Sequence, residues 1–388
     1  MRNLSRPFAR AFSAALGLPC LAAFALCAAA AEAAQEPSRE PAPAAAPQRW
    51  ALVPIFMSTA ETGVQAGALV MRFLAPADTA DKPSSIGFAA RISQLGQAQI
   101  NLFPEWYSRG NRYHVDGEIN YIRWPADFYG IGNDRDLSKD SADAYLAQGL
   151  NGMVTVEREW FRNVAAGPLA RFSYEEIDIR GDRGLLTPAV AGREGGLVAG
   201  IGMQATYDGR DGVYWARNGT FARLKTVWHR PAWGSGFAFE CHTLETRRFF
   251  PLFATGALGL AASLQVQEGD VPFRELATAD GDHALRGIVR GKYRDRNLLL
   301  LQAEYKSYLP DRSWLSHKWV RNRLGWAAFA EAGQVAPEAD AFAWDGFRPA
   351  YGFGLRYAMN PDQRMNIRLD IGFVDGGIAP AINIKEAF

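Results

Sequence analysis

Cysteine is scarce in this chain, and its scarcity excludes two kinds of structure. Of three cysteines, Cys20 and Cys27 lie in an apolar stretch near the N-terminus, which leaves Cys241 alone in the remainder. A single thiol cannot form an intrachain disulfide, and one cysteine with scattered histidines lacks the ligand spacing of a zinc site. The sequence therefore predicts a fold without covalent cross-links and indicates neither a metal nor another cofactor.

The chain also lacks an excess of charge of one sign. It carries 42 Lys and Arg against 41 Asp and Glu, and its first 33 residues hold only three arginines and one glutamate. A nucleic-acid-binding protein is expected to show a basic excess, so nucleic acid is excluded as a partner. No phosphate-binding loop occurs either.

A secretory leader opens the sequence. Arg2, Arg6 and Arg10 precede an apolar stretch from Ala11 to Ala31, and Ala31-Glu32-Ala33 is a candidate cleavage site. We predict a signal peptide over residues 1–33, cut somewhere within 28–34. Residues 34–49 are rich in Pro, Ala, Glu and Gln without periodicity, which predicts a disordered tether. The composition then stays uniform, so residues 50–388 are predicted to form one domain.

Long apolar runs are absent from that domain, and alternation takes their place. No stretch reaches the ~18 apolar residues of a transmembrane helix. In 365–374, Ile367, Leu369 and Ile371 share one face, while Arg368 and Asp370 share the other. Residues 297–306 and 115–120 alternate in the same way. A soluble sandwich also alternates, but its strands average about six residues, whereas a strand crossing a bilayer needs about ten.

The sequence predicts sixteen strands of this alternating kind. Their predicted first residues are Trp50, Gly63, Ser85, Gly96, Asn111, Ala144, Val164, Gly196, Gly219, Ser235, Phe253, Asn297, Val320, Ala350, Arg364 and Ala381. An even number lets the first and last strands pair antiparallel. The predicted fold is all-β: a transmembrane antiparallel β-barrel of about 16 strands.

Several motifs in these segments resemble one protein family. The longest connection, about Gln267 to Arg296, contains Ala284-Leu285-Arg286-Gly287-Ile288 and precedes Gln302-Ala303-Glu304-Tyr305. Four further motifs are Phe128 to Asp134, Tyr207 to Asp211, Phe329 to Gly333 and Gly352 to Tyr357. Together they resemble the BamA/TamA superfamily of outer-membrane proteins, the bacterial surface-antigen barrels. The resemblance also implies sixteen strands.

The resemblance implies a site in the long loop. In the family this loop folds into the barrel lumen, where the arginine of its Arg-Gly pair meets an acidic residue on the wall. Arg286, Gly287 and Glu331 match these positions, and the alternation of 324–331 places Glu331 on the inward face. The alternative is that Arg286 is a solvated loop cation. An aromatic usually follows the Arg-Gly, and Ile288 replaces it here.

The other motifs predict structural roles. Gly130, Gly132 and Asn133 are typical of a turn after a strand, and Asp208, Arg210 and Asp211 of a turn at the barrel rim with local ion pairs. At the C-terminus, Ile382, Ile384 and Phe388 share one face of the last strand. Such a segment is expected to be recognised by the barrel-assembly machinery during insertion.

The function expected from this resemblance is non-enzymatic. Family members that insert or export proteins usually carry periplasmic modules before the barrel, whereas here only the short tether precedes Trp50, so the chain resembles a barrel-only branch. We expect an integral protein of the Gram-negative outer membrane, surrounded by lipid. A plugged lumen and a lateral seam, weakened by Pro54, Gly377 and Pro380, would assist insertion or translocation of an unidentified protein or lipid client.

Two other functions stay open from the sequence. One is a passive porin-like channel, because a sixteen-stranded barrel is wide enough to conduct water. The other is an outer-membrane lipid hydrolase with His242 as the base. The alternation predicts that His242 faces the lumen, opposite Phe237, Phe239 and Cys241, and Trp233-Gly234-Ser235-Gly236 is not a nucleophile elbow. Both observations argue against a hydrolase.

Overall fold

The computed structural model describes residues 50–59, 62–74, 84–133, 141–212, 214–279, 284–288, 291–309, 323–360, 365–374 and 377–384. The predicted signal peptide, the tether and Phe388 lie outside these residues. Within them, helices long and apolar enough to span a bilayer are absent.

The domain is built from sixteen long strands and one short two-stranded ribbon. The long strands are β1 (Trp50–Thr59), β2 (Gly63–Phe73), β3 (Ser85–Ser93), β4 (Ala98–Tyr107), β5 (Tyr113–Phe128), β6 (Asp143–Phe161), β7 (Val164–Ile179), β8 (Gly195–Asp208), β9 (Gly219–His229), β10 (Phe239–Leu252), β11 (Gly256–Gly269), β14 (Asn297–Tyr308), β15 (Leu324–Ala336), β16 (Arg348–Asn360), β17 (Met365–Val374) and β18 (Gly377–Ile384). The ribbon pairs β12 (Ala277–Thr278) with β13 (Arg294–Asp295). Within the described residues, the 3₁₀ turns η1 (Arg109–Asn111), η3 (Pro231–Trp233) and η5 (Trp344–Gly346) lie in connections.

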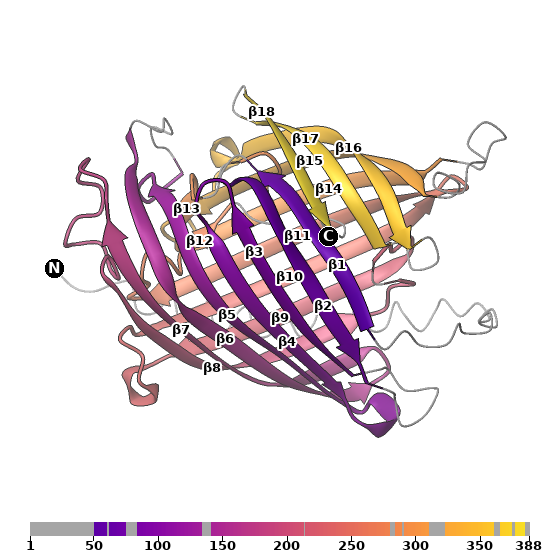
Figure 1. Cartoon of the computed structure of the whole chain (residues 1–388), viewed down its shortest axis with the longest axis horizontal. Coiled ribbons are helices and arrows are strands. Elements are labelled where there is room, and N and C mark those ends of the chain that lie inside the picture. The colour runs from indigo at the N-terminus through magenta and orange to yellow at the C-terminus, as the bar shows by residue number, and fades with distance from the viewer. Residues whose placement is uncertain are drawn as a thin grey trace. The chain divides into compact units, whose positions relative to one another are not determined.

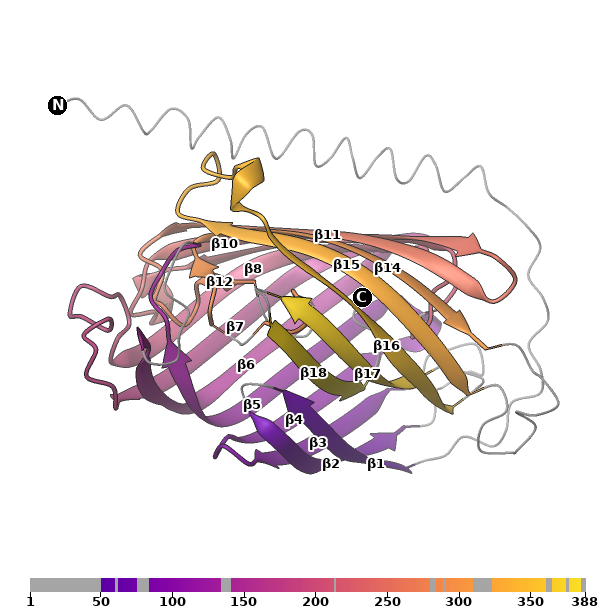
Figure 2. The same cartoon turned by 90° about the horizontal axis from the view of Figure 1, so that it is seen from above.

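Each long strand pairs antiparallel with its neighbours in the chain, so the strand order follows the sequence around a ring (Figure 1). The β12–β13 ribbon is bypassed, because β11 pairs directly with β14. The ends of the ring meet weakly. Among the described residues β1 and β18 share one residue pair, Ser58 with Ile382, whereas β1 pairs with β2 along its whole length. Figure 2 shows β18 and β1 from a second side.

The predicted strands agree with this order, with shifts at some ends. The strand predicted from Ser235 begins at Phe239, because η3 and the left-handed Gly234 form a turn before it and the Ser235 hydroxyl bonds to the Phe237 carbonyl oxygen at 2.7 Å. The last strand begins at Gly377, before the predicted Ala381, because β17 continues its pairing to Val374–Gly377.

The two faces of the sheet differ as the alternation predicted. On β17, Asn366, Arg368 and Asp370 are buried, while Ile367 and Leu369 are exposed. On β16 the exposed large residues Tyr351, Phe353 and Leu355 likewise alternate with buried ones. We call the face with the buried polar residues the inner face. An outer face this apolar would be costly in water and fits lipid.

Strand β10 departs from the prediction for His242. Phe239 is buried in an inner-face cluster with Phe128, Phe273 and other apolar residues, and Cys241 packs against the same cluster. His242 therefore lies on the outer face, and the predicted lumenal direction is wrong. The reason is physical: loop residues cover this part of the inner wall, so an apolar side chain is stable there and no longer identifies the lipid side.

Candidate functional site

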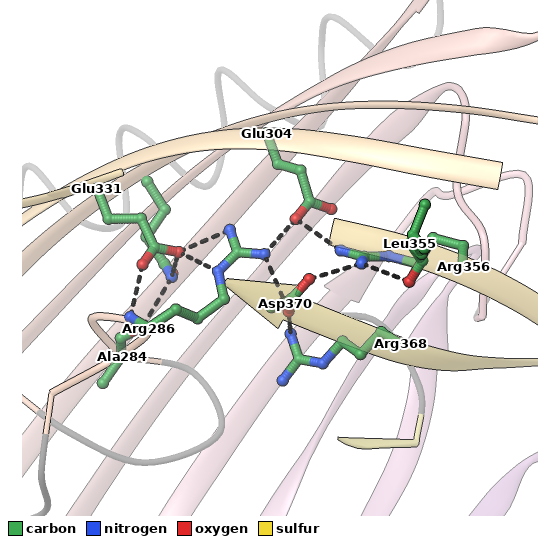
Figure 3. Close-up of polar contacts among 9 residues, drawn as sticks. Ala284, Arg286, Glu304, Glu331, Leu355, Arg356, Arg368 and Asp370 are labelled. Carbon is green, nitrogen blue, oxygen red and sulfur yellow. Dashed lines mark hydrogen bonds and ion pairs between the residues drawn. The ribbon is translucent and has the colours of Figure 1, made fainter. Parts of the chain in front are cut away.

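Arg286 is held by three strands of the inner face. It lies in the connection between β11 and β14, and its backbone N–H donates to Glu331 Oε2 at 2.7 Å. The side-chain Nε donates to Glu331 Oε1 at 2.8 Å, so one carboxylate on β15 receives both the loop backbone and the guanidinium. The Nη1 group donates to Glu304 on β14 and lies 3.6 Å from Asp370 Oδ2 on β17 (Figure 3). The structure thus brings together the predicted pair.

Two further arginines complete this set, which we call the Arg286 cluster: Arg286, Arg356 and Arg368 with Glu304, Glu331 and Asp370. Arg356 donates to Asp370 Oδ1 at 2.6 Å and to Glu304 Oε2 at 3.3 Å. Arg368 Nη1 lies 3.4 Å from Asp370 Oδ2. Three guanidinium groups therefore face three carboxylates, and the buried Lys306 adds a further positive charge beside Glu304.

The charge of Arg286 is secured by its neighbours. Burial alone would lower the pKa of this guanidinium, but Glu304, Glu331 and Asp370 outweigh burial and raise that pKa above its ordinary value. Arg286 therefore stays charged at every physiological pH. Guanidinium forks and carboxylates match in geometry, which makes such contacts strong and directional.

Packing supplements these polar contacts. The Arg286 guanidinium lies over the Phe329 ring, 3.5 Å from its centroid, so the aromatic partner comes from the wall and not from the loop. Ile288, which replaces the usual loop aromatic, packs instead in an apolar cluster with Leu285, Leu300 and other residues. Gly287 has a φ of 98°, which favours glycine.

The backbone of the loop also lies directly against the backbone of β17. A Cβ added to Gly372 would lie 2.4 Å from the Arg286 carbonyl oxygen, and one added to Gly287 would touch the Gly372 backbone at 3.4 Å. Two glycines that face each other therefore let the loop lie directly on the wall.

A second anchor, which the sequence did not reveal, holds the first half of the same loop. Arg171 on β7 donates to both carboxylate oxygens of Glu275 at 2.8 Å. Arg274 donates to Glu175 on β7 at 2.9 Å and to the Tyr145 hydroxyl on β6 at 3.1 Å. The sequence signal for this anchor was the pair Arg274-Glu275 in a long loop, and such pairs are common on any protein surface.

The charges of this second anchor are stable. Burial opposes the charged form of Glu275, but Arg171, His229 and Arg274 outweigh it and hold the pKa of that carboxyl below its ordinary value. Phe273, the residue before Arg274, packs its ring edge-on against Phe128 of β5 and Tyr145 of β6. The loop is thus fastened to β6 and β7 at one end and to β14, β15 and β17 at the other.

The predicted turn residues Gly130, Gly132 and Asn133 connect parts far apart in sequence. Gly130 and Gly132 have positive φ, and the Gly132 N–H donates to the Arg294 carbonyl oxygen at 2.7 Å. Asn133 donates from Nδ2 to the Gly346 carbonyl oxygen at 2.6 Å and accepts from the Val335 N–H at 3.2 Å. This segment therefore ties the β5 end both to the loop and to the β15–β16 connection.

The other predicted residues are not part of the Arg286 cluster. Arg210 donates to both oxygens of Asp208, at 2.8 and 2.7 Å, and Asp211 accepts from the Arg217 N–H at 2.9 Å, which are local contacts within one connection. Ile382 and Ile384 lie in β18, and Phe388 lies outside the described residues.

His242 makes contacts that superficially suggest catalysis. Its Nδ1 lies 3.2 Å from Thr226 Oγ1, and its Nε2 lies 3.6 Å from Glu240 Oε2. Glu240, however, also pairs with Arg230. The strand pairs continuously with β9 and β11 here, so the neighbouring backbone N–H groups are committed to the sheet and cannot form an oxyanion hole.

An antiparallel sheet of sixteen long strands, with polar residues inward and apolar residues outward, defines an outer-membrane β-barrel. The chain belongs to the Omp85 superfamily, because the Omp85 superfamily domain matches residues 82–374. Barrels of this family reside in the bacterial outer membrane and are generally non-enzymatic, so the predicted family and localisation are confirmed.

Solved structures agree on the fold. BamA from Haemophilus ducreyi lacking POTRA domains 1–3 matches with a TM-score of 0.57 and 13% identity, covering 87% of this chain and 70% of that one. CdiB from Escherichia coli matches with a TM-score of 0.58 and 9% identity, and CdiB from Acinetobacter baumannii with 0.54 and 10%. Each covers 87% of this chain, which spans 63% and 60% of those two proteins. A search of curated proteins gave no match.

Proposed function

We propose that this protein is a closed, plugged barrel that assists insertion or translocation of a client without enzymatic chemistry. In this proposal the connection 270–296 fills the lumen, and the β1–β18 seam opens sideways toward lipid. The client is a protein or a lipid. Outer-membrane lipid surrounds the barrel, and the barrel-assembly machinery inserts it by way of the C-terminal segment that includes Ile382, Ile384 and Phe388.

The Arg286 cluster is the observation that most strongly supports the proposed plug. A buried ion pair persists only where its desolvation is offset by good geometry and further hydrogen bonds, and Arg286 meets three carboxylates on three strands. The second anchor, with Arg171 and Glu275, supports the same conclusion from the opposite side. A loop fastened at both ends argues against the porin-like alternative, which needs an open path for solutes.

The seam is supported by its pairing and composition. Among the described residues the β1–β18 ladder is limited to Ser58 with Ile382. Pro54 in β1 and Pro380 in β18 lack the N–H that a ladder needs. Judged by the pairs between described residues, opening this contact would therefore cost less than parting any other two neighbouring strands.

A disulfide across the seam tests lateral opening. Ser58→Cys with Ile382→Cys, in a Cys241→Ser background, places thiols on directly opposite residues, whose Cα spacing of about 4.5–5.5 Å suits a disulfide. The protein and lipid composition of the outer membrane would be compared with that of cells lacking the chain. We expect the oxidised variant to reproduce the deletion and the reduced variant to behave as wild type.

A matched control joins residues that need not separate. Ala51→Cys with Met71→Cys, in the same background, links paired residues of β1 and β2 and should change nothing. If cells with the oxidised seam keep the wild-type composition while the deletion alters it, lateral opening is ruled out.

A further inference from the structure

Three metal-ligating side chains from two neighbouring strands converge on the inner face, on strands other than those of the Arg286 cluster. His114 and Asp116 lie near the start of β5, and Glu157 lies near the end of β6. One ligand atom from each lies within 4.8 Å of the other two. With metal–ligand distances of about 2.0–2.2 Å, the ligand atoms of a tetrahedral ion lie about 3.4 Å from one another. Small side-chain adjustments would therefore bring all three onto one ion.

Second partners orient two of these ligands. His114 Nε2 lies 3.0 Å from Glu105 Oε1, and the Tyr107 hydroxyl donates to the same oxygen at 2.7 Å while its ring stacks on the imidazole. Thr206 donates to Glu157 Oε1 at 2.9 Å. This leaves His114 Nδ1 facing Glu157 Oε2 at 4.0 Å. A carboxylate on the far nitrogen of a histidine is the usual support of a metal-binding imidazole.

An unpartnered hydroxyl independently points to a ligand here. Thr155 lies directly opposite Asp116 in the β5–β6 register and two residues before Glu157, so all three side chains are on one face. Opposite residues have Cβ atoms about 4.5–5.5 Å apart. Thr155 is 1% exposed, and within the described part of the chain its hydroxyl has no hydrogen-bond partner. Buried polar atoms are normally satisfied, and a metal ion or its bound water would satisfy this one.

The local charge favours a divalent cation. Glu105, Asp116 and Glu157 contribute three carboxylates, and the guanidinium that acts on Asp116 is that of Arg223. The carboxylates at this site therefore outnumber the guanidinium groups that act on Asp116. The side chains of Glu105 and His114 are 39% and 26% exposed, which gives an ion in water a path to the site.

We propose that His114, Asp116 and Glu157 bind one divalent transition-metal ion, such as Zn²⁺ or Mn²⁺, with the Thr155 hydroxyl and water completing its coordination. An imidazole with carboxylates selects these ions over Ca²⁺ and Mg²⁺, which prefer oxygen ligands alone. The bound ion would cross-link β5 to β6. This inference is independent of the plug and the seam.

Calorimetric titration of the refolded, chelator-treated barrel tests the site. Zn²⁺ and Mn²⁺ are titrated separately, with Ca²⁺ for comparison. We expect one Zn²⁺ or Mn²⁺ per chain, with Ca²⁺ binding at least about tenfold more weakly. His114→Ala and Asp116→Asn should abolish binding, and Glu105→Gln should weaken it about 10- to 100-fold, because Glu105 only orients the histidine.

His242→Ala is the matched control, since it removes a histidine of the outer face and should leave the titration unchanged. Asp116→Asn and Glu105→Gln preserve side-chain size, and the folded state of each variant is checked by its heat-dependent migration in gels. Absence of saturable binding by the wild type overturns the site. So does equal binding by folded His114→Ala or Asp116→Asn, because the metal would then lie elsewhere.

Discussion

Replacement of Arg286 by alanine should release the loop. The backbone bond to Glu331 can survive, but the contacts of the guanidinium with Glu331, Glu304 and Asp370 and with the Phe329 ring are lost. Removing one partner of a buried ion pair costs about 3–5 kcal/mol, because the remaining charges stay buried without compensation. The open fraction of the loop should therefore rise by roughly two to three and a half orders of magnitude.

Limited trypsin digestion measures that fraction, since cleavage follows the open population when opening is faster than cutting. Cleavage at Arg294, which follows Arg286 in the same connection, should accelerate strongly in Arg286→Ala and in Glu331→Ala. Arg210→Ala, which removes a local pair with Asp208, is the control and should digest as the wild type does. Wild-type digestion rates in both cluster variants would refute the latch.

Substitutions that keep the charge sharpen this test. Arg286→Lys should still loosen the loop, because an ammonium cannot replace the fork that contacts Glu331 and Glu304 together. Exchanging the two residues, as Arg286→Glu with Glu331→Arg, should not restore the wild type. The new carboxylate would face Glu304 and Asp370, so a simple two-residue pairing would be indicated only if the exchange restored full protection.

Three other outcomes are expected. The pKa of Glu275 in the folded protein lies below its ordinary 4.5, so the stability that its ionised carboxylate gives to the loop is complete above that pH and is lost as the pH falls through the folded pKa. The loop should therefore lose its protection against hydrogen exchange only in acid. In Glu275→Gln that protection should be low at every pH. Gly372→Ala should destabilise the loop by about 1–3 kcal/mol, because the added Cβ would clash with the Arg286 carbonyl oxygen. Gly212→Ala is the control and should cost little, because a Cβ there has more room. Equal melting temperatures of the two variants would contradict this prediction. Asn133→Ala should accelerate hydrogen exchange of the Val335 N–H, whose acceptor it removes, and unchanged exchange there would argue against the tie.

The fold was largely predictable because apolar and polar residues alternate along the strands. A wet inner wall and a lipid-facing outer wall require a period of two, which residues 297–306 and 365–374 display. The prediction fails at Phe239 and Cys241, where loop residues cover the wall and make an inward apolar side chain stable. A period of two identifies which residues share a face, but not which face is covered.

The site was predictable only where a motif marked it. Arg286 and Glu331 were identified from the family resemblance, and the structure places them in contact. Glu304 and Arg356 lie within two of the family motifs, and Asp370 lies on the inward face of an alternating segment, but no role could be predicted for them, because their meeting depends on strand register. The same reason hid the approach of Glu157 to His114 and Asp116: the first lies on β6 and the other two on β5, and they become neighbours only through the β5–β6 pairing.

Single-channel conductance in planar bilayers tests the central claim most directly, with wild type, Arg286→Ala and the control Arg210→Ala recorded side by side. A plugged barrel predicts low or flickering conductance for the wild type and for the control, and large steady openings for Arg286→Ala. Large steady openings already in the wild type would contradict the account and indicate a porin-like channel.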